Sequence, residues 1–347
     1  MNATPARGAA ADAESALVAA AKRGDERAFE RLTAPYRREI HVHCYRMLGS
    51  FTDAEDLVQE TLLRAWRALP RFEERASFRA WLYKIATNAC LKSLAKRRGR
   101  LAPTSLGPPA QVGEPPAPPV AEVLHLQPYP DALLDTAPDA DPAARYALRE
   151  SIELAFIAAI QHLTPRQRAV LILRDVLGIP ASETAELLET TAAAVNSSLQ
   201  RARAALAGLR EPDDAPRALS DEVERSLLRR YVDAWQRADI PGLMALLHED
   251  AVMSMPPSPT WYLGPTAIGA FFGSRPVDGE GIERLRLLET RANGRPALAA
   301  YAAGDDGVHR PYGLMVLTID GEAISAITGF LEQGLFEAFG LPETLAA

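Results

Sequence analysis

A stretch of helical character at residues 191–206 carries side chains that can read the edges of DNA bases. Three small residues, Ala192 to Ala194, open it and would let the backbone approach a base pair closely. After them come side chains that donate and accept hydrogen bonds, and arginines that bind guanine edges or phosphates. These are Asn196, Ser197, Gln200, Arg201 and Arg203.

The residues before this stretch predict how it would be held. Thr164-Pro165 supplies an N-cap and a first helical position for a helix over Arg166 to Leu177. A short helix at 181–188 and a tight turn at Glu189-Thr190 follow. Two helices joined in this way predict a helix-turn-helix, whose second helix enters a major groove. An ordinary solvated helix in a bundle is the alternative, because the segment has a net charge of only +1 and the turn has no glycine.

Charge is distributed unevenly along the 347 residues, whose formal net charge is -7. Residues 1–100 carry a net +7, whereas residues 211–347 carry -10. The basic end could meet a polyanion, and the acidic end should avoid one. A chain of this length with 48% hydrophobic residues predicts two to three domains, each with its own core.

Several protein classes are excluded by composition. No apolar run approaches the roughly 18–20 residues that cross a bilayer. Two cysteines, Cys44 and Cys90, cannot build a disulfide framework, and neither has the spacing of a metal ligand. We therefore expect a cytoplasmic protein with no membrane contact, no metal and no cofactor, in which both thiols are buried as small hydrophobic groups.

Proline divides the chain. Residues 101–140 contain 10 of the 27 prolines and no lysine or arginine, so we predict a partly extended linker over 99–142. Its part from His125 to Leu134 is more apolar than a spacer needs, which suggests that it docks on another surface; an incidental apolar patch is the alternative. A second break, Glu211 to Pro216, separates the helical block 143–210 from the acidic remainder.

The spacing of apolar residues sets the fold class. Before the linker they recur every three to four positions, which predicts an all-α domain at 12–98. From Arg284 the period changes to two, and Asp320-Gly321 has the composition of a hairpin turn. We predict a multidomain chain in which two all-α domains, a helical bundle and a helix-turn-helix, precede an α+β domain at 221–345.

Three segments of the chain carry long motifs that distinguish one protein family from others. Two are His43-Cys-Tyr-Arg-Met-Leu-Gly-Ser-Phe-Thr-Asp-Ala-Glu-Asp-Leu-Val-Gln-Glu-Thr-Leu-Leu-Arg-Ala-Trp66 and Phe72-Glu-Glu-Arg-Ala-Ser-Phe-Arg-Ala-Trp-Leu-Tyr-Lys-Ile-Ala-Thr-Asn-Ala-Cys-Leu91. The third is Leu163-Thr-Pro-Arg-Gln-Arg-Ala-Val-Leu-Ile-Leu-Arg-Asp-Val-Leu-Gly178. The first two resemble region 2 of bacterial sigma factors of the extracytoplasmic function (ECF) class, and the third, with Val195 to Arg203, resembles their region 4. The resemblance implies a promoter-specificity subunit that binds core RNA polymerase, recognises a two-element promoter and helps melt the minus-10 region.

The resemblance also implies roles for individual residues. The helix Asp53 to Trp66 matches the polymerase-docking surface, and its acidity within a basic domain suits a protein partner. Carboxylates that stabilise the helix dipole are the alternative. The core polymerase-binding residues would be Asp53, Glu55, Asp56, Gln59, Glu60 and Arg64.

The promoter-reading residues fall in two groups. The loop Arg71 to Ser77 and the helix Phe78 to Leu94 match the part that holds an unstacked minus-10 base. Trp81 would stack there or pack in the core. The minus-10 residues would be Phe72, Ser77, Lys84, Asn88 and Lys92, and the minus-35 residues would be Ala193, Ala194, Asn196, Ser197, Gln200, Arg201 and Arg203.

The acidic third domain opens with Leu227 to Val252, which resembles the SnoaL-like, or NTF2-like, α+β cone. The resemblance implies an apolar cavity, although the same residues could simply form the core. A pocket for an unknown small ligand would be lined by Met253, Met255, Trp261, Tyr262 and Phe271.

Catalysis would need a polar dyad in that pocket, but no spacing pairs the candidates Tyr231, Asp250, Tyr262, His309 and Tyr312. We therefore expect no catalytic residue and a domain that regulates the sigma pair. A polymerase-independent helix-turn-helix regulator with a ligand-sensing domain is the alternative function.

Overall fold

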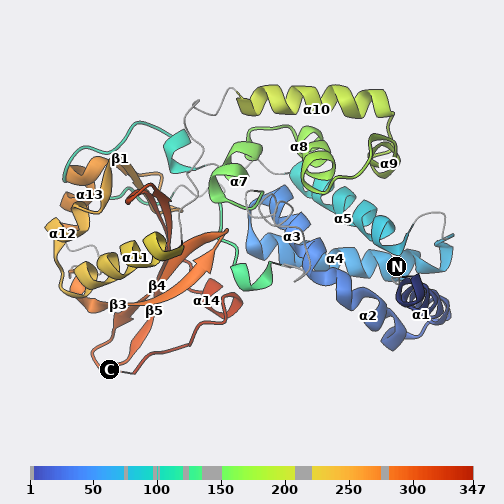
Figure 1. Ribbon diagram of the computed structural model, residues 1–347, viewed down its shortest axis with the longest axis horizontal. Helices are drawn as coiled ribbons and strands as arrows, with labels where there is room; N and C mark the ends of the chain where they lie inside the picture. The colour runs from blue at the N-terminus through green and yellow to red at the C-terminus, as the bar shows by residue number, and fades with distance from the viewer. Residues whose placement is uncertain are drawn as a thin grey trace. The chain divides into compact units, whose positions relative to one another are not determined.

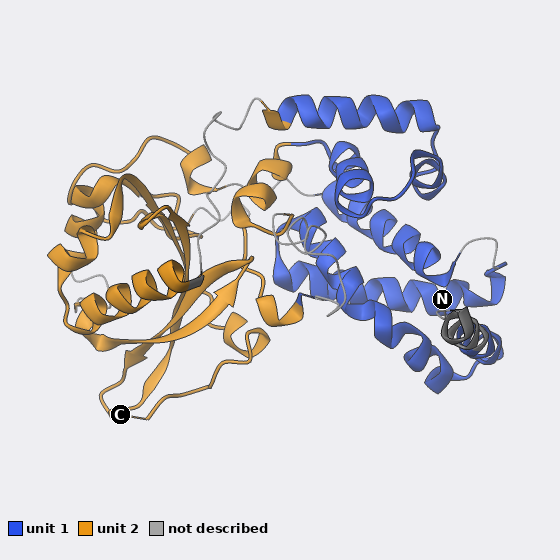
Figure 2. Ribbon diagram, in the orientation of Figure 1, with its two compact units in different colours: residues 1–97, 134–138, 163–205 blue, residues 98–133, 139–162, 206–347 orange. Residues whose placement is uncertain are grey.

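The chain forms two compact units, which Figure 2 shows in different colours. Unit 1 comprises residues 1–97, 134–138 and 163–205, and unit 2 comprises 98–133, 139–162 and 206–347. The predicted linker and the start of the predicted helix-turn-helix domain lie partly outside the described residues. The computed structural model describes residues 4–73, 77–96, 100, 102–119, 125–134, 151–207, 221–274 and 281–346.

Unit 1 is helical, as predicted (Figure 1). The predicted N-cap at Thr164 is present and forms a capping box with Gln167; Ser50 supplies a further cap, which was not predicted, by accepting a hydrogen bond from the backbone N–H of Asp53 at 3.2 Å. The helices are α1 (Thr4–Lys22), α2 (Glu26–Thr33), α3 (Arg37–Leu48), α4 (Phe51–Ala68), α5 (Phe78–Leu94), α8 (Pro165–Leu171, continued by a π turn at Ile172–Val176), α9 (Ala181–Leu187) and α10 (Ala192–Ala207).

The core of unit 1 lies where α3 packs against α4 and α5. Cys44 on α3 and Cys90 on α5 are both fully buried there, so the prediction that the thiols serve as small hydrophobic groups is confirmed. A hydrogen bond with the Cys44 thiol, together with burial, raises the pKa of Cys90. The Cys90 thiol therefore stays protonated and unreactive in this core.

Unit 2 contains one six-stranded sheet with the order β2-β1-β6-β5-β4-β3, in which β1 runs parallel to β6 and the other pairs are antiparallel. Helices α11 to α13 pack on it and bury a core that includes Tyr231, Trp235 and Phe272. The strands are β1 (Leu247–Ser254), β2 (Trp261–Leu263), β3 (Leu285–Ala292), β4 (Arg295–Ala303), β5 (His309–Asp320) and β6 (Ala323–Phe330). The helices are α7 (Leu154–Gln161), α11 (Asp221–Gln236), α12 (Ile240–Met244), α13 (Gly264–Gly273) and α14 (Leu335–Ala338).

The α+β prediction for the third domain is confirmed, and Asp320-Gly321 does join β5 to β6, with Gly321 at φ +58°. Strand β1 was not predicted. Its outward residues His248, Glu249 and Asp250 are consecutive, so the strand lacks the alternation of a half-buried strand. Asp250 accordingly lies exposed within β1.

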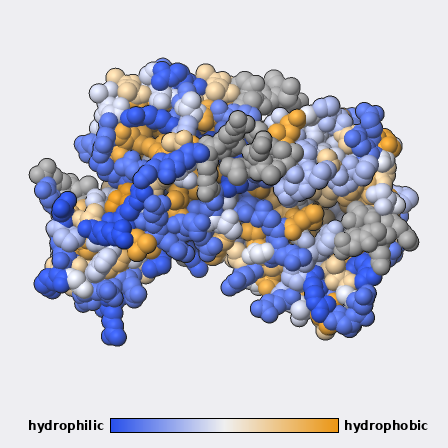
Figure 3. All heavy atoms as spheres, turned by 180° about the vertical axis from the view of Figure 1, so that it is seen from behind, coloured by the Kyte–Doolittle hydropathy of each residue, from blue (hydrophilic) through white to orange (hydrophobic). Residues whose placement is uncertain are grey.

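The described surface is mixed in character. Figure 3 shows one face of the molecule, on which hydrophobic patches lie between more extensive hydrophilic areas. Among the helices of the described residues, none is both long enough and apolar enough to cross a membrane.

Candidate functional site

Helix α10 presents the predicted base-reading side chains to solvent. Val195, Leu199 and Ala202 are buried at helical spacing and fix the rotation of the helix. Thr191 caps it by accepting a hydrogen bond from the N–H of Ala194 at 3.2 Å. The residues on the outer side, all exposed, are Ala193, Ala194, Asn196, Ser197, Gln200, Arg201 and Arg203.

The two arginines of α10 differ in their partners. Arg201 donates to the Ser197 hydroxyl at 2.8 Å, one turn back on the same helix. Arg203 binds Asp175 of the π turn with both its Nε and Nη2 atoms, at 2.9 and 2.7 Å, and this carboxylate raises the pKa of Arg203. The carboxylate offsets part of the positive charge that the sequence alone attributes to this face.

The turn between α9 and α10 contains Glu189 at φ +51°, a conformation that favours glycine. The Glu189 carboxylate lies 3.1 Å from the Nζ atom of Lys84 on α5. Of the predicted minus-10 residues on α5, Asn88 and Lys92 are exposed, whereas Lys84 is half-buried and paired with this turn.

The loop before α5 places its two predicted minus-10 residues differently. Ser77 is exposed but serves as the N-cap of α5, where it accepts a hydrogen bond from Ala80 N–H at 3.2 Å. Phe72 is buried, with its ring centroid 4.9 Å from that of Trp81, and the Nζ atom of Lys22 on α1 lies over the Phe72 ring, 5.5 Å from the centroid. In this arrangement Phe72 packs in an aromatic cluster and has no surface for a base; Trp81 is half-buried in that cluster.

Helix α4 exposes an acidic face with an apolar centre. Glu55, Asp56 and Gln59 are exposed, Asp53 is half-buried near the helix start, and Glu60 binds Arg64 one turn later. Leu63, which was not among the predicted site residues, has a side chain that is 57% exposed on this helix. Leu57, Leu62, Leu63 and Trp66 recur at helical spacing, which indicates a buried stripe, so the spacing gives no sign that Leu63 is exposed.

In unit 2, the proline-rich linker lies along β2, an edge strand of the sheet. The Ala110 N–H donates to the Trp261 carbonyl at 2.8 Å, and the Trp261 indole N–H donates to the Gly107 carbonyl at 2.8 Å. The Tyr262 hydroxyl donates to the Glu114 carbonyl at 3.1 Å. Linker and domain are therefore joined by direct hydrogen bonds at this edge.

A second part of the linker docks at the β3–β4 turn, near the opposite edge of the same sheet. Asn293 is fully buried there and bonds three groups outside its own strand pair: the N–H and the carbonyl of Tyr129, and the carbonyl of Ile152. Asp131 accepts from the Gly294 N–H at 2.8 Å. The prediction that His125 to Leu134 docks on another surface is confirmed.

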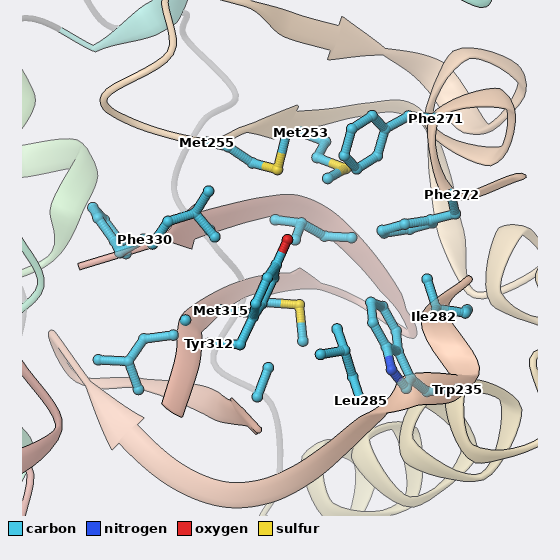
Figure 4. Close-up of a pocket in the computed structure, with 16 residues that line it drawn as sticks. Trp235, Met253, Met255, Phe271, Phe272, Ile282, Leu285, Tyr312, Met315 and Phe330 are labelled. Carbon is cyan, nitrogen blue, oxygen red and sulfur yellow. The ribbon is translucent and has the colours of Figure 1, made fainter. Parts of the chain in front are cut away.

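An apolar cavity lies between the sheet and the helices of the C-terminal domain (Figure 4). Its volume is about 50 Å³, and Met253, Met255 and Phe271 line it as predicted. The Tyr312 ring stands in the wall with its oxygen directed toward Met255. Phe272, predicted to line a cavity or the core, also lies in the wall, and further lining residues that were not predicted include Trp235, Ile282, Leu285, Met315 and Phe330.

Trp261 and Tyr262, also predicted to line the pocket, lie outside the cavity wall and bind the linker. The polar side chains that catalysis would need do not gather either. Burial raises the pKa of Tyr231, Asp250 points to solvent, and the backbone of His309 pairs with that of Leu345. Within the described residues no group of three or more metal-ligating side chains was found.

Three segments match known families. Residues 32–100 match Sigma-70 region 2, residues 153–206 match Sigma-70 region 4, and residues 228–325 match the SnoaL-like domain.

Individual proteins are similar over most of the chain. The ECF RNA polymerase sigma factor SigG of Mycobacterium tuberculosis is 46% identical over 327 residues, which are 93% of this chain and 86% of that protein. SigJ of the same organism is 28% identical over 288 residues, 78% of this chain and 80% of that protein. The crystal structure of SigJ has a similar fold, with a TM-score of 0.56 at 23% identity, covering 88% of this chain and 97% of that chain.

Proposed function

We propose, from the premise that this chain belongs to the ECF RNA polymerase sigma factors, that it uses the surfaces of α4, α5 and α10 to bind core polymerase and to read a two-element promoter. It is an alternative sigma factor with a SnoaL-like C-terminal domain. Since a sigma factor acts together with core polymerase and DNA, we place it in the cytoplasm.

The observation that carries the assignment of the DNA-reading surface is the exposed polar row on α10. Asn196, Gln200 and Arg201 are side chains that bind base edges, and they follow directly after a helix-turn-helix turn. For the minus-10 element we propose Asn88 and Lys92 of α5, with Lys84, Phe72 and Ser77 contributing once their present contacts are released.

The acidic face of α4 is proposed as the polymerase contact. Glu55, Asp56 and Gln59 lie one to two turns before Leu63 and are exposed like it, so an exposed apolar group adjoins a polar surface on the same helix. Interfaces commonly combine a buried apolar anchor with a polar rim. Asp53, Glu60 and Arg64 would lie at that rim.

Run-off transcription with core polymerase tests the proposal. The templates are a library with randomised minus-35 and minus-10 elements, and the variants are Asn196→Ala and, as a control on the exposed side of α9, Ser182→Ala. We expect transcripts that depend on the added chain, with a changed minus-35 preference for Asn196→Ala alone. Tight promoter binding without polymerase, and no directed initiation, would instead support the polymerase-independent regulator.

We further propose that the C-terminal domain regulates the sigma pair by holding the chain between regions 2 and 4. The support is the linker itself, which is bonded to β2 at one sheet edge and to the β3–β4 turn near the other. A chain held at two places cannot extend freely, so release or retention of the linker would change how the two DNA-reading regions move.

Single aromatic substitutions test this regulation without removing the domain. Trp261→Phe and Tyr262→Phe each delete one hydrogen bond to the linker. Tyr301→Phe is the matched control, because its hydroxyl bonds Pro342 within the domain. Equal promoter output and equal polymerase affinity for all three variants would rule the regulation out.

For the cavity we propose a small uncharged ligand rather than a substrate. Its lining contains no Asp, Glu or His among the described residues, and Tyr312 supplies a hydroxyl. The volume of about 50 Å³ is about a third of the ~150 Å³ apolar cavity that holds benzene, so a ligand of that size requires the flexible Met253, Met255 or Met315 to move. Native mass spectrometry of the purified chain tests this, with a ligand-sized mass that is lost on unfolding as the expected result.

A further inference from the structure

The wall of the cavity in the C-terminal domain contains a hydrogen-bond donor that the described residues do not satisfy. Trp235 of α11 lines the cavity and is only 2% exposed, and its indole nitrogen is buried with no hydrogen-bond partner among the described residues. Buried tryptophan nitrogens usually find an acceptor, because an unpaired donor loses its bonds to water without compensation. The folded domain therefore bears the cost of one unpaired N–H group beside its cavity.

The neighbours of Trp235 are poor acceptors. The Phe272 ring meets it edge to face, with centroids 5.2 Å apart and planes at 80°, and the Tyr231 ring lies 5.9 Å away on the same helix. Figure 4 shows the Trp235 ring extending into the cavity, with its nitrogen on the side of Leu285. An N–H group that faces aromatic or aliphatic carbon gains much less than one that faces an oxygen. An oxygen acceptor for this nitrogen would have to come from a molecule in the cavity.

Two glycines of the sheet leave room for such a molecule. Gly313 of β5 and Gly329 of β6 both line the cavity, and Gly329 stands opposite Met315 in the β5–β6 pair. A Cβ atom at Gly329 would lie 3.3 Å from Cγ of Met255, so a side chain there would crowd this methionine. The missing side chain leaves space next to two thioether side chains that can change conformation at little cost.

Leu331 marks a place where the cavity meets solvent. It follows β6, lines the cavity and is 43% exposed. A Cβ atom at Gly313 would lie 3.1 Å from the Cδ2 atom of Leu331, so this leucine covers the glycine at that end of the wall. Because its side chain is exposed, it can rotate without disturbing the core, and a ligand can enter on this side.

The composition of the wall limits the class of ligand. Among the described residues it includes no Asp, Glu, His, Lys or Arg, so a carboxylate or ammonium group would be buried without a counter-charge. The unpaired group at Trp235 is a donor, which selects a ligand with an acceptor. A carbonyl oxygen accepts a hydrogen bond and brings no N–H or O–H group that needs a partner of its own.

We propose that the cavity binds an apolar carbonyl compound, a ketone or an ester, whose oxygen accepts a hydrogen bond from the indole N–H of Trp235. The inference rests on the cavity ligand of the proposed function and assigns its chemical class. Because the indole nitrogen is buried, the methionine movement that a benzene-sized ligand requires must also uncover this nitrogen. Binding then replaces an unpaired buried donor by a paired one, which favours the complex.

Two probes of equal shape test the inference on the full chain. Cyclohexanone carries the carbonyl, and methylenecyclohexane has a CH₂ group in place of the oxygen. Removal from water costs the ketone more, so a wall without a usable donor favours the alkene. Binding is followed by NMR of ¹³C-labelled methionine methyl groups, because Met253, Met255 and Met315 line the cavity. Labelling of the indole nitrogens with ¹⁵N reports on Trp235 directly, and its resonance is the one that Trp235→Phe lacks.

We expect cyclohexanone to bind at least as tightly as methylenecyclohexane and to shift the Trp235 indole proton downfield, with a smaller shift for the alkene. Tighter binding of the alkene, or ketone binding with no larger indole shift, would overturn the inference. If neither probe shifts the methionine methyl groups, the cavity ligand of the proposed function fails, and this outcome is distinguishable from binding of both probes without the hydrogen bond.

The ratio of the two dissociation constants separates the hydrogen bond from the cavity volume. Trp235→Phe enlarges the cavity for both probes but removes the donor for the ketone alone. We expect the Kd of cyclohexanone to rise about five- to ten-fold relative to that of methylenecyclohexane. Tyr231→Phe is the matched control, because its hydroxyl is also buried without a partner among the described residues but does not line the cavity.

An unchanged ratio for Trp235→Phe, or an equal change for Tyr231→Phe, would contradict the role of Trp235. The indole shift is measured in the natural chain, so it decides the question even if Trp235→Phe does not fold.

Discussion

Asn293 and Tyr129 hold each other by two hydrogen bonds although 164 residues separate them in the sequence. The Tyr129 N–H donates to the Asn293 side-chain oxygen at 2.8 Å, and the Asn293 N–H donates to the Tyr129 carbonyl at 2.9 Å. Both residues are fully buried. Asn293 has φ +56°, which asparagine tolerates better than most residues. The same residue therefore adopts the backbone conformation of the turn and makes the hydrogen bonds to the linker.

Two substitutions of Asn293 should lower the free energy of unfolding of unit 2 by different amounts. Asn293→Gly keeps the backbone conformation but removes the amide, leaving the buried Tyr129 N–H and Ile152 carbonyl unsatisfied at about 1–3 kcal/mol each. Asn293→Ala adds about 1–2 kcal/mol of left-handed strain. We expect the free energy of unfolding, measured by denaturant titration of the full chain, to fall from natural chain to Asn293→Gly to Asn293→Ala. Two variants of equal stability would contradict the strain, and an unchanged Asn293→Gly would contradict the role of the amide.

The sequence predicts that the linker docks but not where. The apolar character of His125 to Leu134 is visible in composition, whereas Asn293-Gly294 has only the composition of a hairpin turn. Nothing local indicates that its amide bonds a distant segment, because such a contact depends on how the chain folds back. Trp261 and Tyr262 show the same limit: their apolar rings suggested a pocket, but their polar atoms bind the linker.

Leu63 should contribute to polymerase affinity and little to stability. Its side chain is 57% exposed in the acidic face of α4, so Leu63→Ala leaves the core intact. Loss of an apolar anchor at an interface costs more than about 1 kcal/mol, a five- to ten-fold rise in Kd. Fluorescence titration with core polymerase measures it. Val112→Ala, at a side chain 63% exposed in the linker, is the control, and an equal Kd for both variants would remove Leu63 from the interface.

Asp175 should weaken promoter binding through Arg203. Asp175→Asn removes the negative charge that Arg203 faces at 2.7 Å, so the guanidinium becomes available to a phosphate. We expect holoenzyme affinity for the promoter to rise several-fold, and the slope of log affinity against log salt to steepen by about 0.9. Asp306→Asn, which breaks the comparable Arg310 pair in unit 2, is the control. An unchanged slope for Asp175→Asn would place Arg203 outside the DNA contact.

Helices with local sequence signals are predicted better than the strand β1 and the contacts between distant residues. The helices of unit 1 follow from caps and apolar periodicity, which are local signals, and Thr164 and Ser50 serve as the N-caps. Strand β1 was missed because its exposed residues are consecutive. The burial of Phe72 and the pairing of Lys84 were missed for another reason, since each depends on a partner from a distant helix or turn, Lys22 or Glu189.

Acid should destabilise unit 1 through His43. Burial, with a smaller effect of Arg46, lowers the pKa of His43 from its ordinary value of 6.5 to about 3. Between these values the unfolded chain binds a proton that the folded chain does not, so stability falls as the pH drops from 6.5 toward 3, by up to about 1.4 kcal/mol per pH unit. His41, whose pKa burial lowers to about 4, adds to the slope. We expect His43→Gln to flatten the dependence of the unfolding free energy on pH in this window. A slope that His43→Gln does not alter would mean that His43 is not the group that titrates on unfolding.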